Sequence, residues 1–404
     1  MYDVCVIGAG ASGLCCAITA ARRGLNVYVI EKNKKAGKKL YATGNGKCNL
    51  TNRYFSFAHN YHSTSSQYEL FLKTLLGSKP DEELFHFFES IGLKVYQTTE
   101  GYVYPMSNQA SAVVWSMLDE AQQLGVKFDF RTQVTNIHKN TDSFTIHTTN
   151  GQITASEVVL ACGGRSYPSL GGSDYGYQLA KSVGHTITNV MPALCGVKVK
   201  EDISSLSGVR ARANVNITLH EEVIAYEDGE VQFTNYGLSG IVIFNMTSII
   251  GKNLSLSNDI QVVINLLPGI TPDEIKNLYD ISKNRFIHGT INSLLNDKLA
   301  CYILHKIGIN EKTKTSDVSF SKFKEIIHYA KHFTCSVDAL CDYETAQVCS
   351  GGVCIDEIDA VSCESKICPG TYVVGEILDI DGACGGYNLT FAFISGIRAG
   401  EHIC

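Results

Sequence analysis

The stretch Tyr2-Asp-Val-Cys-Val-Ile-Gly-Ala-Gly-Ala-Ser-Gly13 decides the fold of this chain. The apolar run at 4–7 predicts a buried strand, and a helical pattern follows directly at 14–23. A second apolar strand at 26–30 then ends at Glu31. A strand, a glycine-rich turn, a helix and a strand that ends in an acid are typical of a dinucleotide-binding fold.

Each glycine of this turn has a physical role. Gly8 allows the tight turn, Gly10 lets the backbone approach a pyrophosphate, and Gly13 lets the helix and the strand pack closely. The helix N-terminus directs free N–H groups and a partial positive charge at the phosphates. Glu31 stands where a carboxylate accepts hydrogen bonds from an adenosine ribose, which favours FAD or NAD over NADP. The alternative is a glycine-rich turn in some other α/β domain.

Composition limits the class of protein. A chain of 404 residues is long enough for about two or three domains, and 45% hydrophobic with 18% charged residues is typical of a globular protein. The net charge of −6 gives no reason to expect a nucleic-acid partner. No apolar run reaches the roughly 18 residues that a membrane span needs. Because the first strand begins at residue 2 or 3, we expect no signal peptide and predict a cytoplasmic protein without a membrane partner.

The 15 cysteines include no CxxC pair. The nearest approaches are Cys349 with Cys354 and Cys363 with Cys368, and their spacing fits no strong zinc or iron–sulfur pattern. We therefore predict no metal site and expect reduced, mostly buried thiols. A cluster held by these four cysteines is the alternative.

The pattern along the rest of the chain predicts a domain that is interrupted by an insertion. Helical patterns lie at 67–76, 81–91 and 110–124, and strand patterns at 126–130, 133–138, 144–148 and 152–160. Short strands at 197–199, 214–220, 223–227, 232–234 and 259–265 predict a barrel or sandwich. Residues 268–333 are helical and polar, with a good helix start at Thr271. A strand at 372–374 and a closing helix at 387–400 then resume the pattern of the first domain.

Several blocks together resemble the flavoprotein family that groups the bile-acid-inducible enone reductases with aminoacetone oxidase-type enzymes. Besides the glycine turn, the blocks are Thr43-Gly-Asn-Gly-Lys-Cys-Asn49, Ala161-Cys-Gly-Gly164, Gly229-Glu-Val-Gln-Phe-Thr234, Gly351-Gly-Val353, Gly375-Glu-Ile-Leu-Asp-Ile-Asp-Gly382 and Gly385-Gly-Tyr-Asn-Leu389. The resemblance covers nearly the whole chain. The chain departs from the family pattern at Lys47, where Arg is usual, at Asn235, where His is usual, and at Ile241, where Pro is usual.

The resemblance implies FAD as the cofactor and a particular fold class. This class is α/β, with a two-dinucleotide-binding-type Rossmann domain that binds FAD. We place this discontinuous domain at 1–193 and 339–404, an inserted β-barrel-like domain at 194–270 and an inserted small helical domain at 271–338.

Three further segments are expected to contact the flavin. Glu376 follows a buried strand and can accept hydrogen bonds from ribityl hydroxyls, while the helix N-terminus at 385–388 can face the pyrimidine edge of the ring. The loop at 43–49 can pass close to the flat ring. The alternatives are a helix-capping acid, ordinary helix packing and a basic solvated loop. The predicted cofactor-binding residues are Gly8, Gly10, Ala11, Ser12, Gly13, Glu31, Lys32, Lys38, Lys39, Thr43, Gly44, Asn45, Gly46, Lys47, Cys48, Asn49, Val134, Ala161, Gly163, Gly164, Gly375, Glu376, Asp381, Gly385, Gly386, Tyr387, Asn388 and Leu389.

The predicted function is that of an FAD-dependent oxidoreductase. NADH or NADPH would act as a transient donor, because no second GxGxxG with its own strand and acid is present. Reduced FAD would then deliver hydride to a C=C bond conjugated to a carbonyl in an enone or steroid-like small molecule. Tyr102, Tyr104 and Tyr387 are the candidate catalytic proton donors, and a half-buried structural role is the alternative for each. The alternative functions are a flavin-dependent amine or aminoketone oxidase that uses oxygen and a flavoprotein that acts on tRNA.

Overall fold

The computed structural model describes residues 1–404, which form two compact units. The first consists of Met1–Met191 and Gln347–Cys404, and the second of Pro192–Ala346. No helix in the chain combines the length and the apolar character needed to cross a lipid bilayer. The barrel and the helices of the second unit share one hydrophobic core. The division of the insertion at residue 270 therefore stays a prediction.

The first unit is built on a seven-stranded sheet in the order β7-β2-β1-β10-β9-β8, with β19 also paired to β10. Its parallel strands are β7 (Lys127–Phe130), β2 (Val27–Glu31), β1 (Tyr2–Ile7), β10 (Gly151–Leu160) and β19 (Thr371–Val373). The antiparallel strands are β9 (Phe144–Thr148) and β8 (Val134–Lys139). Parallel strands are usually covered on both faces, and the burial of β1 from Val4 to Ile7 agrees with this. This confirms the predicted Rossmann-type α/β fold.

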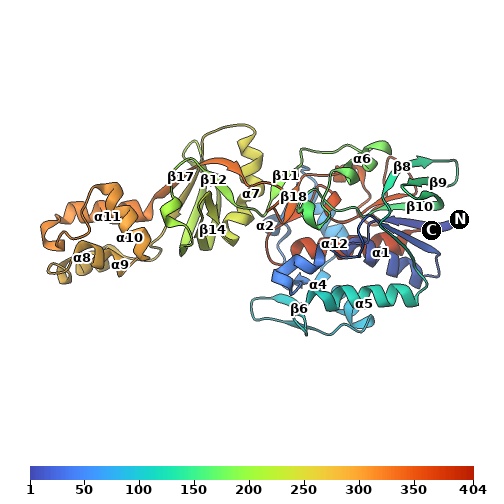
Figure 1. Ribbon diagram of the computed structural model, residues 1–404, viewed down its shortest axis with the longest axis horizontal. Coiled ribbons are helices and arrows are strands. Elements are labelled where there is room, and N and C mark those ends of the chain that lie inside the picture. The colour runs from blue at the N-terminus through green and yellow to red at the C-terminus, as the bar shows by residue number, and fades with distance from the viewer. The chain divides into compact units, whose positions relative to one another are not determined.

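Two helices from opposite ends of the chain lie side by side against this sheet (Figure 1). They are α1 (Ala11–Arg22) and α12 (Tyr387–His402). Their close approach requires glycine, because a Cβ at Gly396 would lie 2.1 Å from the backbone oxygen of Ser12. A Cβ at Gly400 would lie 2.7 Å from the oxygen of Cys16. The last helix is thus held directly against the helix that follows the glycine turn.

Smaller elements surround the sheet. The predicted helices at 67–76, 81–91 and 110–124 correspond to α3 (Tyr68–Leu76), α4 (Pro80–Ser90) and α5 (Ala110–Gln123). A three-stranded sheet that the sequence analysis did not predict consists of β3 (Thr51–Asn52), β6 (Tyr102–Pro105) and β5 (Val95–Gln97). The other elements are η1 (Leu40–Gly46), α2 (Phe57–Asn60), β4 (Tyr61–His62), η2 (Pro168–Leu170), α6 (Tyr175–Ser182), β18 (Val348–Ser350), η5 (Ile355–Glu357), η6 (Gly375–Ile377) and β20 (Asp381–Gly382), and β11 (Met191–Ala193) lies where the chain leaves this unit.

The second unit contains a closed barrel in the order β12-β15-β14-β13-β16-β17. Its strands are β12 (Val197–Val199), β13 (Arg210–Leu219), β14 (Glu222–Phe233), β15 (Gly237–Ser239), β16 (Ile260–Asn265) and β17 (Phe333–Leu340). The two strands predicted at 223–227 and 232–234 are one strand, because β14 pairs with β13 along its length. Gly229 resembles a turn residue in the sequence, but a Cβ there would lie 2.9 Å from the Val242 side chain. The missing side chain at Gly229 thus allows α7 (Ile241–Leu254) to pack on β14.

The helical part of this unit contains four α-helices, which Figure 1 draws together in ochre to orange. They are α8 (Pro272–Ile281), α9 (Ile287–Asn292), α10 (Asp297–Ile307) and α11 (Phe320–Lys331), and the short turns η3 (Ser204–Leu206) and η4 (Thr315–Asp317) also belong to the unit. The helix start predicted at Thr271 is confirmed. The Thr271 side chain accepts from the Glu274 N–H, and the Glu274 carboxylate accepts from the Thr271 N–H.

Candidate functional site

The glycine turn after β1 divides into packed positions and one open position. Gly8 has φ +111°, and a Cβ there would lie 2.4 Å from the Ala161 oxygen. A Cβ at Gly13 would lie 1.9 Å from the Gly8 oxygen. A Cβ at Gly10, in contrast, would meet no atom within 4 Å. Gly8 and Gly13 are therefore required by the packing of the protein itself, whereas the space beside Gly10 is open.

Helix α1 begins at this open space without a capping side chain. Its N-cap residue is Gly10, which has no side chain to accept a hydrogen bond. The first N–H groups of a helix have no partner within the helix, so those of Ala11, Ser12 and Gly13 are available to an acceptor. Free N–H groups and the positive end of the helix dipole together form an anion-binding position.

Glu31 ends β2 and lies next to the same turn. It is 7% exposed, and it accepts hydrogen bonds from the Ala9 N–H at 2.9 Å and from both the backbone and side-chain nitrogens of Asn33 at 2.7 Å. A carboxylate offers about four acceptor positions. The three donors fix the orientation of this group and leave an acceptor position for a ligand hydroxyl.

Glu376 lies at the centre of a second polar cluster. Its carboxylate contacts Lys39 Nζ at 2.7 Å and Ser166 Oγ at 2.9 Å, and it accepts from the Cys349 N–H at 3.3 Å. A Cβ at Gly164 would lie 3.0 Å from this carboxylate. Three predicted residues, Lys39, Gly164 and Glu376, thus meet here. The sequence analysis missed Ser166 and Cys349, which follow no recognised motif.

The cluster around Glu376 is continuous with the glycine turn. A Cβ at Gly375 would lie 2.5 Å from Ser12 Oγ, and the Gly375 N–H donates to Ser395 Oγ at 3.0 Å. Gly163 has φ +69°, and a Cβ there would lie 3.8 Å from Glu376. The carboxyl ends of β1, β10 and β19 therefore place the glycine turn, the Ala161–Gly164 segment and Glu376 at one edge of the sheet. In open α/β sheets, ligands bind at this edge.

Other predicted residues on this side have protein partners of their own. Lys32 Nζ donates to Ser173 Oγ at 2.7 Å, and Lys38 Nζ donates to the Ser169 oxygen at 2.8 Å. Burial lowers the pKa of Lys32. Val134 begins β8 and is buried. Both lysines thus bond to the 165–174 segment.

The segment 43–49, predicted as a loop, is in part a 3₁₀ turn interrupted by left-handed residues. Gly44, Asn45 and Gly46 have φ of 54°, 55° and 83°. Thr43 Oγ1 donates to the Leu40 oxygen at 2.7 Å, and Lys47 forms the C-cap of this turn. Cys48 is buried, and burial raises the pKa of its thiol to about 11, so it is a packing residue.

The N-terminus of α12 resembles that of α1. Gly386 has φ +101°, a Cβ there would lie 2.8 Å from the Thr51 backbone, and α12 also begins without a capping side chain. The Asn388 side chain is occupied, because it accepts from the Gly382 N–H at 2.8 Å and donates to the Gly382 oxygen at 2.6 Å. Its carboxamide therefore holds the neighbouring loop, while Leu389 packs on the core.

The three candidate tyrosines lie near one another. Tyr102 and Tyr104 share one face of β6, alternating with the buried Val103. Burial raises the pKa of Tyr387 to about 12 and also raises that of Tyr104, and the Tyr102 phenol adds to both shifts. The Tyr387 hydroxyl already donates to the Tyr54 oxygen at 2.8 Å. The Tyr387 hydroxyl is therefore engaged by the protein backbone.

Asp379 is a buried acid that the sequence analysis missed. It accepts from the Thr64 N–H at 3.1 Å and from the Thr64 hydroxyl, while its Oδ1 has no hydrogen-bond partner. Burial raises the pKa of Asp379 to about 6, and the Asp381 carboxylate adds to the shift. Asp381, which was predicted, is also buried and pairs with His62 between β20 and β4. The Asp-Ile-Asp spacing was the available signal for Asp379.

Comparison with known proteins agrees with this geometry. The family model for the HI0933-like protein Rossmann domain matches residues 2–402. The 3-dehydro-bile acid delta(4,6)-reductase of Clostridium scindens is 34% identical over 408 residues, covering 99% of this chain and 98% of that protein. A ribosomal RNA dihydrouridine synthase of Escherichia coli is 28% identical, covering 98% of this chain and 96% of that protein. The structure of a 3-ketosteroid delta1-dehydrogenase from Sterolibacterium denitrificans superposes with a TM-score of 0.53 at 14% identity, covering 100% of this chain and 99% of that one, which shows a shared fold.

The fold, the glycine turn and these relatives define the chain as an FAD-dependent oxidoreductase. More specifically, it belongs to the HI0933-like family of Rossmann-domain proteins, which confirms the resemblance inferred from its sequence blocks.

The different surroundings of the glycines give a testable contrast. Gly10→Val places its side chain in the open space, so we expect a folded protein that is purified with less than about a tenth of the flavin bound by the parent protein. Gly13→Val forces a side chain against the Gly8 oxygen, so we expect it to lose soluble folded protein as well. The flavin-to-protein absorbance ratio and circular dichroism measure the two effects. Full flavin content in Gly10→Val would contradict the assignment of this space to the cofactor.

Asp379 predicts a pH-dependent stability. Its pKa is about 6 in the folded chain against 3.8 ordinarily, so the folded state binds this proton more tightly and loses stability as pH rises from about 4 to about 6. We expect Asp379→Asn to be more stable than the parent by about 1–3 kcal/mol at neutral pH, with a difference that vanishes near pH 4. Thermal unfolding across this range measures it. Asp356→Asn, which changes a carboxylate hydrogen-bonded to Ser65, is the matched control. A constant difference at all pH values would contradict the assignment.

Proposed function

We propose that this protein reduces a C=C bond conjugated to a carbonyl in an enone or steroid-like small molecule, with NADH or NADPH as the electron donor. The observation that carries the proposal is the 34% identity, over 99% of the chain, to a 3-dehydro-bile acid delta(4,6)-reductase. That name describes reduction of C=C bonds at positions 4 and 6 of a bile acid that is oxidised at position 3. Hydride transfer to such a bond is chemistry that a flavin supplies when it is bound.

The residues present fit FAD at the sheet edge described above. The chemistry of the donor set supports this fit. The uncapped N-terminus of α1 suits the pyrophosphate, and the buried Glu31 suits the adenosine ribose. Glu376 is an acceptor suited to the ribityl hydroxyls, and the uncapped N-terminus of α12 suits the pyrimidine edge of the ring. The remaining predicted contacts stay part of this proposal.

The protein must also move a proton. Saturating the C=C bond adds a hydride at the β-carbon and a proton at the α-carbon, so an acid has to stand near the substrate. Tyr102 and Tyr104 are half-buried on one face of β6, and a Cβ at Gly44 would lie 3.7 Å from the Tyr104 ring. This places Tyr104 beside the 43–49 segment that we assign to the flavin. We propose these two phenols as the proton donors.

A ribosomal RNA substrate is the second candidate. The Escherichia coli relative and a Haemophilus influenzae relative, 26% identical over 96% of this chain, are both named ribosomal RNA dihydrouridine synthases. Dihydrouridine differs from uridine by saturation of a C=C bond that is conjugated to a ring carbonyl. The two candidates therefore share one reaction class and differ in the size and charge of the substrate. The higher identity to the bile acid reductase favours a small-molecule substrate, and the net charge of −6 agrees with this choice.

An anaerobic stopped-flow experiment separates these functions. We expect NADH or NADPH to bleach the visible flavin absorbance and a steroid with a conjugated 3-oxo group to restore it without oxygen. Restoration by a uridine-containing ribosomal RNA fragment, and not by the enone, would establish the second candidate. Bleaching by an amine or aminoketone, with peroxide formed only in air, would establish an oxidase and overturn the proposal.

Substitution of single tyrosines tests the proton donors. Tyr104→Phe and Tyr102→Phe are each expected to leave the rate of flavin reduction by the nicotinamide unchanged. Whichever of the two tyrosines is the proton donor, its substitution by Phe should slow the enone half-reaction by about 10²–10⁴-fold. Tyr387→Phe removes a hydroxyl that already donates to Tyr54, so its enone half-reaction should change by less than about threefold. Separate measurement of both half-reactions is essential. Unchanged enone rates in both β6 variants would exclude these phenols.

A further inference from the structure

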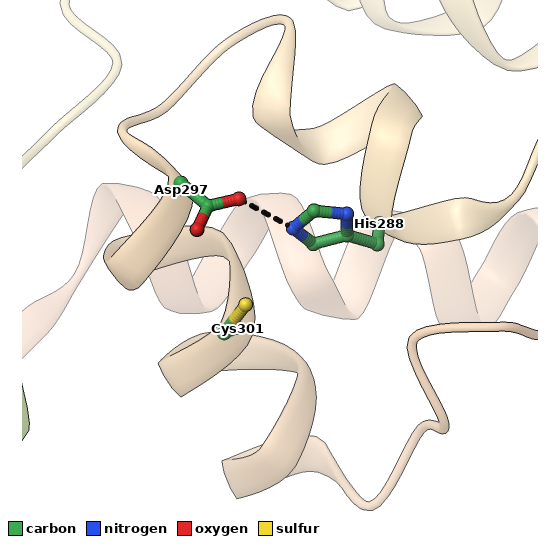
Figure 2. Close-up of side chains that lie close together, drawn as sticks. All are labelled: His288, Asp297 and Cys301. Atoms are coloured by element: carbon green, nitrogen blue, oxygen red, sulfur yellow. Dashed lines mark hydrogen bonds and ion pairs between the residues drawn. The ribbon is translucent and has the colours of Figure 1, made fainter.

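Three potential metal ligands converge in the helical part of the second unit, which contains none of the residues assigned to the flavin. Figure 2 shows His288 of α9 facing Asp297 and Cys301 of α10. His288 Nε2 lies 2.9 Å from Asp297 Oδ1. The nitrogen, oxygen and sulfur ligand atoms all lie within 4.8 Å of one another. Asp297 and Cys301 are one turn apart, so the helix itself presents both on one face.

A fourth side chain with a ligating group adjoins this cluster. The Glu311 carboxylate is hydrogen-bonded to the Cys301 thiol. Its segment is held against α9 by two backbone hydrogen bonds. The His288 backbone N–H donates to the Glu311 backbone carbonyl at 3.4 Å, and the Ile287 backbone N–H donates to the Thr313 carbonyl at 2.8 Å. Burial and then the neighbouring Glu311 and Asp297 raise the pKa of the Cys301 thiol. The Cys301 thiol thus lies between the carboxylate of Glu311 and the pair formed by His288 and Asp297.

The acidic residue of α10 is not needed to cap its helix. The Asn296 side chain already accepts from the Lys298 N–H at 3.0 Å and performs that role. Lys298 Nζ, the neighbouring positive charge, donates to the Ser207 oxygen at 2.9 Å. The carboxylate of Asp297 is 65% exposed and the His288 ring 28% exposed, so both can reorient and an ion can reach them.

We propose that His288, Asp297 and Cys301 form a zinc site, with Glu311 or a water as the fourth ligand. The donor set of imidazole nitrogen, thiolate sulfur and carboxylate oxygen suits Zn²⁺ rather than Mg²⁺ or Ca²⁺, which take oxygen ligands. Zinc bond lengths of about 2.0–2.3 Å place tetrahedral ligand atoms about 3.4–3.6 Å apart. The present separations, up to 4.8 Å, therefore close by about 1 Å of side-chain movement. Bound zinc would join α9 to α10.

The site is tested with the complete flavoprotein after removal of metal by a chelator. Zinc is titrated against a chromophoric zinc indicator, and Co²⁺ is added separately as a spectroscopic substitute. We expect about one Zn²⁺ per chain, together with a thiolate-to-cobalt charge-transfer band. His288→Ala and Cys301→Ser should each weaken zinc binding by at least about tenfold, and Cys301→Ser should abolish the band. His138→Ala at an exposed position of β8 in the first unit and Cys404→Ser at the exposed C-terminus are the matched controls.

A measurement on the parent protein tests the site even if the variants do not fold. Zinc should slow the alkylation of Cys301 by iodoacetamide, measured by mass spectrometry of its peptide, while alkylation of Cys404 is unchanged. Equal zinc affinity in the two ligand variants and the parent protein would overturn the proposal. So would unprotected Cys301 at saturating zinc, which would leave His288 and Asp297 as an ordinary surface ion pair. Neither result bears on the flavin or on the reductase proposal.

Discussion

The close contact between the turn after β1 and the end of β10 is the constraint on which the flavin-binding unit depends. Gly8 leaves no room for a Cβ against Ala161, and Gly13 leaves none against Gly8. Because the turn after β1 contacts the end of β10 in this way, the carboxyl ends of these two central strands lie at the same edge of the sheet. The same contact sets the start of α1, against which α12 then packs through Gly396 and Gly400. A site formed by both ends of the chain follows from glycine packing at a few positions.

The parts of this unit that the sequence predicted well have strong local signals. The apolar run of β1, the glycines after it and the acid at Glu31 together define a strand, a turn and a helix within a short segment. In the second unit, the helix start at Thr271 was equally predictable, because a capping box is a local pattern. Family blocks added Glu376 and the start of α12, whose proximity to the glycine turn no local pattern reveals. Their joint placement at one sheet edge became visible only in the structure.

The features that the sequence did not reveal have a common physical cause. Each depends on contacts between residues that only the fold brings together. Gly229 resembles a turn but lies inside β14, because α7 packs on it. Nothing in the sequence indicated that the Asn388 side chain bonds to Gly382, while the predicted role of its segment at the flavin stays a prediction. Asp379 has a raised pKa because the fold buries it, and the Asp-Ile-Asp spacing of the sequence shows only that a second acid is near, not that this one is buried. His288 and Glu311 likewise meet only because the 311–313 segment returns to α9.

The two hydrogen bonds between Asn388 and Gly382 have a mechanical consequence. The carboxamide accepts from the N–H and donates to the C=O of a single residue, as a neighbouring strand would do. One side chain therefore substitutes for a missing strand and couples the segment that carries Asp379 to the first turn of α12. The segment with the buried acid and the helix terminus assigned to the flavin ring are therefore cross-linked through a single carboxamide.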